Sequence, residues 1–183
     1  MNCTPPSLKP KGAAMTFLRA PLSIVFGIAA ITPASLSAQQ APPKCDTAEF
    51  RQFDFWVGQW NVTVQGKEAG ANVITLEEDG CVVHEHWAGA RGSTGQSFNF
   101  YDRVARRWYQ FWVDNSGNYL YLSGSYADNK MLFTGTVTAA DGSKQEQRLT
   151  FFRNPDGSVR QLWETSSKPG EWQVAFDGLY RKR

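Results

Sequence analysis

From Phe55 onward, runs of apolar and aromatic residues alternate with short polar breaks. The runs are rich in Val, Ile, Thr, Phe, Tyr and Trp, and the breaks carry Gly, Asn or Asp. Nine breaks separate ten runs, and a recurrence of about 8 to 12 residues is typical of strands joined by tight turns. The runs predict strands near 57–65, 72–78, 81–87, 95–101, 107–113, 118–126, 130–138, 144–153, 158–167 and 171–182.

Ten sequential hairpins predict an all-β fold, a closed antiparallel up-and-down barrel of about ten strands. Closure removes the two sheet edges that otherwise invite aggregation. A sandwich is the alternative, but it needs long crossover connections, and none of the breaks is long enough for a comfortable one. Before the first strand, DTAEFRQF predicts one short helix with Asp46 as its N-cap.

Alternation along the strands predicts which side chains share a face. The shared faces are Trp108, Gln110, Trp112 and Asp114; Val159, Gln161, Trp163 and Thr165; and Trp172, Val174, Phe176 and Tyr180. A barrel of about ten strands is too wide for its side chains to fill, so we expect a lined internal cavity. The expected lining is Trp87, Asn99, Tyr101, Trp108, Gln110, Trp112 and Trp163, with Glu85 orienting a ligand or supplying charge.

The first 38 residues differ from the rest of the chain. They carry three basic residues and no acidic one, with a short apolar run around LSIVFGIAAI and small residues at SLSA. This pattern is typical of a secretory signal peptide, and the run is too short to span a bilayer. We expect cleavage near Ala38 and a periplasmic or secreted product, with Met15 as an alternative start. The expected organisation is then a linker and short helix over 39–52 and a single barrel domain over 53–183.

The net charge of the chain is small. The chain has 19 Lys plus Arg against 17 Asp plus Glu, and loss of the leader's three bases leaves 16 against 17. A nearly neutral product gives no reason to expect nucleic acid as a partner, and no membrane span is expected.

The two cysteines outside the leader are Cys45 and Cys81. In an exported protein such a pair favours a disulfide, with two unpaired buried thiols as the alternative. The bridge would close a loop of 36 residues. A chain-entropy model gives such a loop roughly 3 to 4 kcal/mol of stabilisation.

Both histidines lie in the stretch VVHEHW. On a strand, His84 and His86 point to one face, and Glu85 points to the other with Val83 and Trp87. Two histidines at this spacing can share a metal ion, but the third ligand would have to be a carboxylate from a neighbouring strand. Outward-facing, solvated histidines are the favoured interpretation, and neither a metal nor another cofactor is expected.

Glu85 is expected to point inward, where a carboxylate must be paired or protonated. Its candidate partners are Arg148, Arg160, Asn99 and Gln110. An anchor for an internal hydrogen-bond network is favoured over an acid or base, because no nucleophile or second carboxylate accompanies Glu85 at a defined spacing.

The stretch FDFWVGQWNV, with Gly58 and Trp60, resembles the start of lipocalin-like (calycin) barrels. This resemblance implies that Trp60 closes one barrel end and packs against a basic residue of the last strand, Arg181 or Arg183. The ordered motifs DFWVGQWNV, GCVVHEHW, GQSFNFYD, RWYQFWVDNSGNYLYLSG, DGSVRQLWETS and EWQVAFDGLYRKR are similar to a family of exported bacterial proteins with a lipocalin-like domain of unknown function. Nitrobindin-type barrels, which carry haem, are distantly similar, but their ligating histidine late in the chain has no counterpart after His86.

The leading functional hypothesis is an exported barrel that holds a small, largely apolar or aromatic ligand in its interior. A small-molecule enzyme using Glu85 as acid or base is the first alternative. The second is an envelope interaction module whose exposed aromatics Tyr109, Phe111 and Tyr121 form a partner or homodimer surface.

Overall fold

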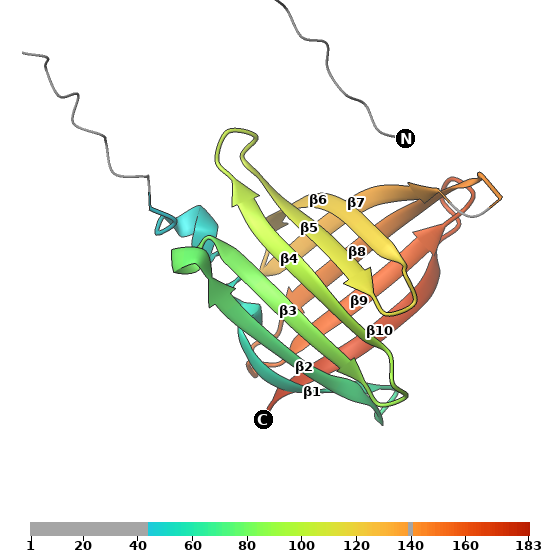
Figure 1. Cartoon of the computed structure of the whole chain (residues 1–183), viewed down its shortest axis with the longest axis horizontal. Helices are drawn as coiled ribbons and strands as arrows, with labels where there is room; N and C mark the ends of the chain where they lie inside the picture. The colour runs from blue at the N-terminus through green and yellow to red at the C-terminus, as the bar shows by residue number, and fades with distance from the viewer. Residues whose placement is uncertain (1–43, 139–140) are drawn as a thin grey trace, which may run out of the picture. The chain divides into compact units, whose positions relative to one another are not determined.

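The computed structural model describes residues 44–138 and 141–183, and the predicted signal peptide lies outside them. Ten antiparallel strands follow one another around a closed barrel, so the predicted fold class is confirmed (Figure 1). The strands are β1 Gly58–Val64, β2 Lys67–Glu77, β3 Val82–Gly89, β4 Thr94–Asp102, β5 Arg107–Asp114, β6 Tyr119–Ala127, β7 Lys130–Thr138, β8 Lys144–Arg153, β9 Val159–Ser166 and β10 Gln173–Lys182.

The barrel closes where β1 pairs with β10. Trp60 lies opposite Lys182 and Val62 opposite Tyr180 in this antiparallel pair. Every other strand pairs with its neighbours in sequence, as the short connections require. The described sheet therefore has no free edge strand.

The first hairpin is tighter than its sequence indicates. Gln65 and Gly66 both have positive φ, 50° and 75°, which is the geometry of a two-residue hairpin turn. Strand β2 therefore begins at Lys67 instead of the predicted residue 72, and most of the expected break GKEAGA belongs to it.

Among the described residues, three short 3₁₀ helices lie outside the strands: η1 Ala48–Arg51, η2 Asp54–Trp56 and η3 Glu78–Gly80. The predicted N-terminal helix is η1, but its N-cap is Thr47 and not Asp46. The Thr47 hydroxyl makes no capping bond and donates to the Glu49 carboxylate instead, at 2.6 Å.

Phe53 and Trp56 fill one end of the barrel. Both are fully buried, and their rings stack with centroids 5.0 Å apart. Phe53 also contacts Trp108 and Phe151 edge to face, with ring centroids 5.8 and 5.0 Å away. Aromatic packing closes this end of the barrel.

A disulfide between Cys45 and Cys81 ties the segment before η1 to the start of β3, as the cysteine usage predicts. Arg51 reinforces this connection because its guanidinium donates to the carbonyl oxygens of Cys45 and Gly80. Phe53 and Trp56 form the aromatic plug of the closed end, and the segment that carries them is thus attached covalently and by hydrogen bonds to the barrel wall.

Trp60 is fully buried, and its indole N–H donates to the Trp56 carbonyl oxygen at 2.8 Å. The basic residue over its ring is Lys182, with the ammonium nitrogen 5.3 Å from the ring centroid. The expected Arg181 and Arg183 face outward instead, toward Asp156 and Asn61. The reason is the alternation of β10, which gives Lys182 the same face as Tyr180.

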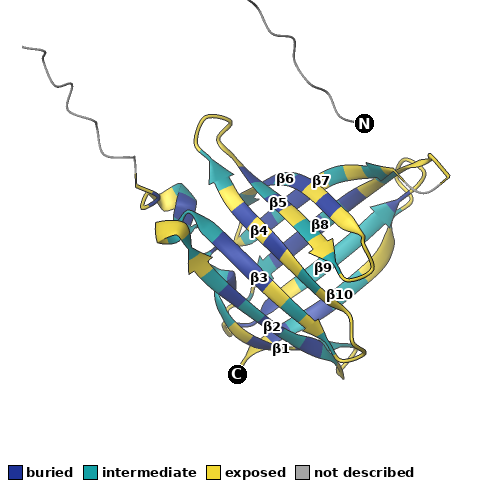
Figure 2. Cartoon of the chain, in the orientation of Figure 1, coloured by how far each residue is buried: buried dark blue, intermediate teal, exposed yellow. Residues whose placement is uncertain are grey.

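Buried and exposed residues alternate along the strands, most clearly in β4 (Figure 2). This period of two separates an inner face from an outer face. Within the described residues, no helix is long and apolar enough to cross a membrane.

Candidate functional site

The barrel holds a cavity of about 670 Å³ away from the aromatic plug. Residues of the β1–β2, β3–β4 and β5–β6 connections surround it, among them Gln65, Arg91 and Asn118. These connections lie at the end of the barrel opposite Phe53 and Trp56, so the cavity belongs to the open end. The aromatic residues of its wall are Trp87, Trp112, Tyr119, Trp163, Phe176 and Tyr180.

The inward tryptophans differ in burial between the two ends. Trp60 and Trp108 at the plugged end are 0% and 1% exposed. Trp87, Trp112 and Trp163 also point inward but keep intermediate exposure, since they border the cavity. The barrel interior is therefore filled at one end and accessible at the other.

Glycine at position 95 makes room for part of this wall. A Cβ atom placed there would lie 2.3 Å from the indole of Trp112, far inside van der Waals contact. Gly95 precedes Ser97 on the inner face of β4 and lies opposite Asp114 at the mouth of the cavity, which is its open end. The absence of a side chain at Gly95 thus leaves room for the Trp112 indole beside the neighbouring strand.

Glu85 lies in the cavity wall with only 5% exposure, and two neighbouring strands supply its partners. Asn72 of β2 donates to Oε1 at 2.7 Å, and Ser97 of β4 donates to Oε2 at 2.6 Å. Each carboxylate oxygen thus accepts one hydrogen bond, which offsets part of the cost of burying the group.

A chain of amides extends this network around the barrel. Asn99 donates to the Ser97 hydroxyl and to the Val83 carbonyl oxygen, both at 2.9 Å. Gln110 donates to the Asn99 side-chain oxygen at 2.8 Å, and its own side-chain oxygen has no partner within the described residues. Gln110 also lines the cavity, so this buried acceptor belongs to the same site as Glu85.

Burial raises the pKa of Glu85 from 4.5 to about 7, and the hydrogen bonds from Ser97 and Asn72 oppose the rise. The carboxyl therefore changes its charge near neutral pH. Burial also raises the pKa of Tyr180, which stays a neutral hydroxyl. Its hydroxyl donates to the Gln161 side-chain oxygen, beside the cavity.

The mouth of the cavity carries both signs of charge. Lys67 and Arg91 lie there with Glu68 and Asp114. Hydrogen bonds from Asn118 and the backbone of its turn lower the pKa of Asp114 against the effect of burial, so it stays ionised. A mixed rim of this kind gives no strong preference for the sign of an entering ligand.

The structure brings together most of the residues predicted for the lining. Glu85, Trp87, Gln110, Trp112 and Trp163 all line the cavity. Asn99, Tyr101 and Trp108 are not among its lining residues. Asn99 lies behind Gln110, and Tyr101 and Trp108 pack at the plugged end, where the Trp108 indole N–H donates to Gln52.

Sequence reasoning missed several residues of the site. Gln161, Phe176 and Tyr180 line the cavity, and the alternation of β9 and β10 already gave them inward faces. Asn72 and Ser97, the partners of Glu85, carried no signal within their own strands. Finding them requires the cross-strand register, which places Ser97 directly opposite Glu85.

The predicted arginine partners of Glu85 are wrong. Arg148 Nε lies 2.8 Å from Glu164 Oε2 in one ion pair, and Arg160 Nε lies 2.7 Å from Asp177 Oδ1 in another. Both arginines alternate with inward residues of their strands and therefore face outward. The predicted amides act indirectly, since Gln110 reaches Glu85 only through Asn99 and Ser97.

The predicted face of the last strand needs one correction. Phe176 and Tyr180 point inward as expected, but Val174 is 62% exposed. An irregularity in the pairing of β10 with β9 falls between Val174 and Phe176 and interrupts the alternation. Trp172 lies before the strand. Its ring packs under the outward-facing guanidinium of Arg148, whose Cζ lies 4.2 Å from the ring centroid.

Both histidines face outward, as predicted, but they are not equally solvated. His86 is exposed. His84 is only 7% exposed because its ring stacks on that of Phe98, with centroids 4.3 Å apart. The chain has no other histidine, so no imidazole lines the cavity.

The exposed aromatics predicted for an interaction surface do lie together on the outer face of β5 and β6. The Tyr121 ring centroid lies 5.9 Å from that of Tyr109 and 6.4 Å from that of Phe111. Tyr121 is 55% exposed and Phe111 40%.

Comparison with models of known protein families gives no match to this chain, and comparison with curated protein sequences gives none either.

Proposed function

We propose that this protein is an exported carrier whose barrel binds one small ligand with an apolar or aromatic body and a hydrogen-bond donor or amine. One observation carries the proposal: Trp87, Trp112 and Trp163 point inward yet stay partly exposed, around a cavity whose wall contains the buried carboxyl of Glu85.

The aromatic wall supports an apolar ligand body. A volume of about 670 Å³ lies within the usual range of small-molecule sites, which are mostly apolar with a few placed polar groups. Trp87 and Phe176 meet edge to face with centroids 6.2 Å apart, which gives this part of the wall a defined shape. An aromatic ligand would bury the exposed indole surface and gain about 25 cal/mol for each Å².

The polar group of the ligand is expected to interact with Glu85. When ionised, this carboxylate accepts hydrogen bonds only, so it favours a hydroxyl, an amide N–H or an ammonium. With a pKa of about 7, Glu85 is present in both its charged and its neutral form near neutral pH. An ammonium beside it would favour the ionised form and bind more tightly than a neutral donor.

Export fits the disulfide between Cys45 and Cys81, because such bridges persist in oxidising compartments. The resemblance to exported lipocalin-like proteins also favours export. It also favours an interior ligand, since the lipocalin class uses its barrel in this way.

A matched probe series tests the proposal. We would titrate the protein with 2-naphthylmethylamine, 2-naphthalenemethanol and 2-naphthoic acid, and follow binding by calorimetry and tryptophan fluorescence. The expected order of affinity is amine, then alcohol, then acid, because the acid places a second carboxylate near Glu85.

Trp112→Ala is expected to weaken amine binding about tenfold or more, since one lost aromatic contact costs on the order of 1.5 kcal/mol. Trp172→Ala is the matched control, because it removes a tryptophan outside the cavity. Equal effects of the two substitutions, or no binding of any probe, would contradict the proposal.

An enzyme is the second candidate, because a carboxyl with a pKa of about 7 is suited to act as a general acid or base at neutral pH. No second carboxylate lies beside Glu85 among the described lining residues, since Glu68 and Asp114 belong to the mouth. Glu85→Gln separates the two functions: an enzyme would lose turnover of its substrate, whereas a carrier would keep the neutral probe and lose affinity for the amine.

A further inference from the structure

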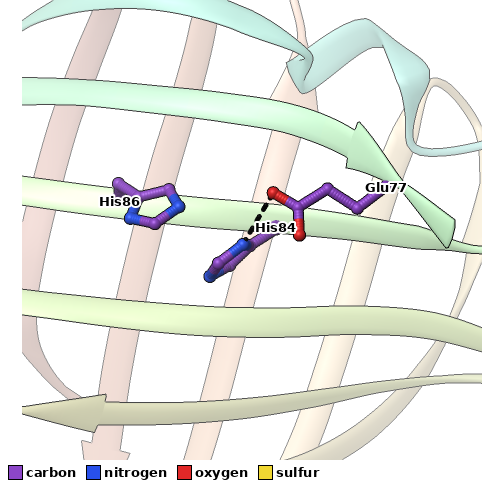
Figure 3. A group of neighbouring side chains, drawn as sticks. All are labelled: Glu77, His84 and His86. Carbon is purple, nitrogen blue, oxygen red and sulfur yellow. Dashed lines mark hydrogen bonds and ion pairs between the residues drawn. The ribbon is translucent and has the colours of Figure 1, made fainter.

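Three potential metal ligands meet on the outer face of the barrel, away from the cavity. Glu77 lies at the end of β2, and His84 and His86 lie two residues apart on β3 (Figure 3). One ligand atom from each of the three residues lies within 4.8 Å of the others. The register explains this proximity: His84 is opposite Thr75, so Glu77 is its diagonal neighbour on the same face.

The ring of His84 is held between two oxygen atoms. Its Nδ1 lies 2.9 Å from Glu77 Oε1, and its Nε2 lies 3.0 Å from the side-chain oxygen of Gln96. A neutral imidazole has one N–H, so it can donate to only one of these acceptors. If Nε2–H donates to Gln96, the lone pair of Nδ1 faces the Glu77 carboxylate, and a bound metal ion would bridge the two groups.

That arrangement is typical of a metal-binding histidine. Such residues donate their second ring N–H to a carbonyl or carboxylate, which fixes the tautomer and the ring orientation. Gln96 is in position to do this for His84, and Phe98 stacks on the same ring at 4.3 Å and restrains it. The ligand at the centre of the cluster is therefore already oriented.

The other two ligands complete the set. The His86 ring centroid lies 4.0 Å from that of His84, and His86 is exposed, which leaves an approach from solvent. Thr75 donates to Glu77 Oε1 at 2.8 Å. The contacts with His84 and Thr75 lower the pKa of Glu77, so its carboxylate is ionised.

We propose that Glu77, His84 and His86 bind one divalent transition-metal ion, with Zn²⁺ as the best match. Two imidazole nitrogens and one carboxylate oxygen are ligands that zinc takes when a water fills the fourth position. Calcium and magnesium take oxygen ligands and do not fit two imidazoles. The site is separate from the cavity, because Glu85 lies between the two histidines in sequence but points to the opposite face.

Imidazole NMR tests the proposal directly. The chain has only two histidines, so a long-range ¹H–¹⁵N spectrum of the untagged, full-length protein shows two imidazoles. Addition of ZnCl₂ is expected to shift both sets of signals, with saturation at one equivalent by calorimetry.

Single substitutions identify the ligands. Glu77→Gln and His86→Ala are each expected to weaken zinc binding at least tenfold, and Gln96→Leu about 10- to 100-fold, the range for loss of such a supporting group. Glu146→Gln is the matched control, because it removes an exposed carboxylate from the β8 strand and should leave affinity unchanged. Circular dichroism and urea unfolding verify that each variant is folded.

Two outcomes would overturn the proposal. In the first, millimolar zinc leaves the signals of both imidazoles unshifted. In the second, Glu77→Gln binds zinc as tightly as the wild-type protein. Either outcome leaves ligand binding in the cavity untouched, since no cavity residue takes part.

Discussion

The Ser97 hydroxyl lies 2.6 Å from Glu85 Oε2 and donates to it across the β3–β4 pair, inside the barrel. This contact stabilises the ionised carboxylate, and burial opposes ionisation more strongly, so the pKa of Glu85 rises to about 7. A buried carboxyl that titrates near neutral pH connects the stability of the fold to the chemistry of the cavity.

Stability is therefore expected to depend on pH through Glu85. Its pKa is higher in the folded protein than the ordinary value of 4.5, so the folded state binds this proton more tightly. The contribution is fully present below about pH 4.5 and is lost as the pH rises to about 7, a change of roughly 3 kcal/mol in the free energy of unfolding. Urea unfolding of the wild-type protein and Glu85→Gln between pH 4.5 and 8 measures it.

The difference between the two proteins isolates this residue, because other carboxyls titrate in both. The pKa of Glu77 and that of Asp177 are lowered, which gives stability that is lost toward acid, with the opposite sign. Identical pH dependence of the two unfolding curves would show that Glu85 does not titrate as described.

Removing Asn99 should break the buried network in two places. Asn99→Leu deprives Gln110 of its acceptor and Ser97 of a donor, and buried unpaired groups cost about 1 to 3 kcal/mol. Asn61→Leu is the control, since Asn61 is exposed and accepts one hydrogen bond from Arg183. Thermal and urea unfolding should show a clearly larger loss for Asn99→Leu, and equal losses would contradict the network.

Reduction of the Cys45–Cys81 disulfide should lower the free energy of unfolding by about 3 to 4 kcal/mol, given the 36-residue separation. Unfolding curves with and without reductant, together with the Cys45→Ser and Cys81→Ser double variant, measure the effect. The hydrogen bonds from Arg51 to both ends of the loop should keep the variant folded. Matching midpoints in oxidised and reduced samples would be inconsistent with a stabilising bridge.

Gly95→Ala should move Trp112 without changing any cavity residue chemically. The new Cβ atom would overlap the indole, so the ring must shift toward the cavity. We expect a changed tryptophan emission maximum and weaker binding of 2-naphthylmethylamine. Gly92 has positive φ, so Gly92→Ala would strain the backbone and is not a suitable control. Trp172→Ala serves as the comparison. Unchanged emission and affinity in Gly95→Ala would contradict the wall geometry.

The sequence predicted most of the fold because each strand carries its own alternation and each turn its own chemistry. Eight of the ten strands begin within one residue of the expected position, and the exceptions are β2 and β10. At β2, a two-residue turn replaced the expected loop, and at β10 the strand starts two residues later than predicted. Both differences are local.

The site was harder to predict because it depends on contacts between strands. Alternation placed Glu85 inward but gave no information about Asn72, which lies on β2 and reaches it across the sheet. The position of each residue along the barrel axis was also not predictable from alternation. Trp108 and Trp112 share a face, yet Phe53 covers the first and leaves the second in the cavity wall.

Native mass spectrometry of the protein purified from its own host tests whether the barrel carries a small ligand. We expect a noncovalent small-molecule mass added to the disulfide-bonded chain, lost on denaturation and reduced in Trp112→Ala but not in Trp172→Ala. A wild-type protein that carries no added mass, and that takes up none of the three naphthyl probes under the same conditions, would contradict a ligand-binding barrel.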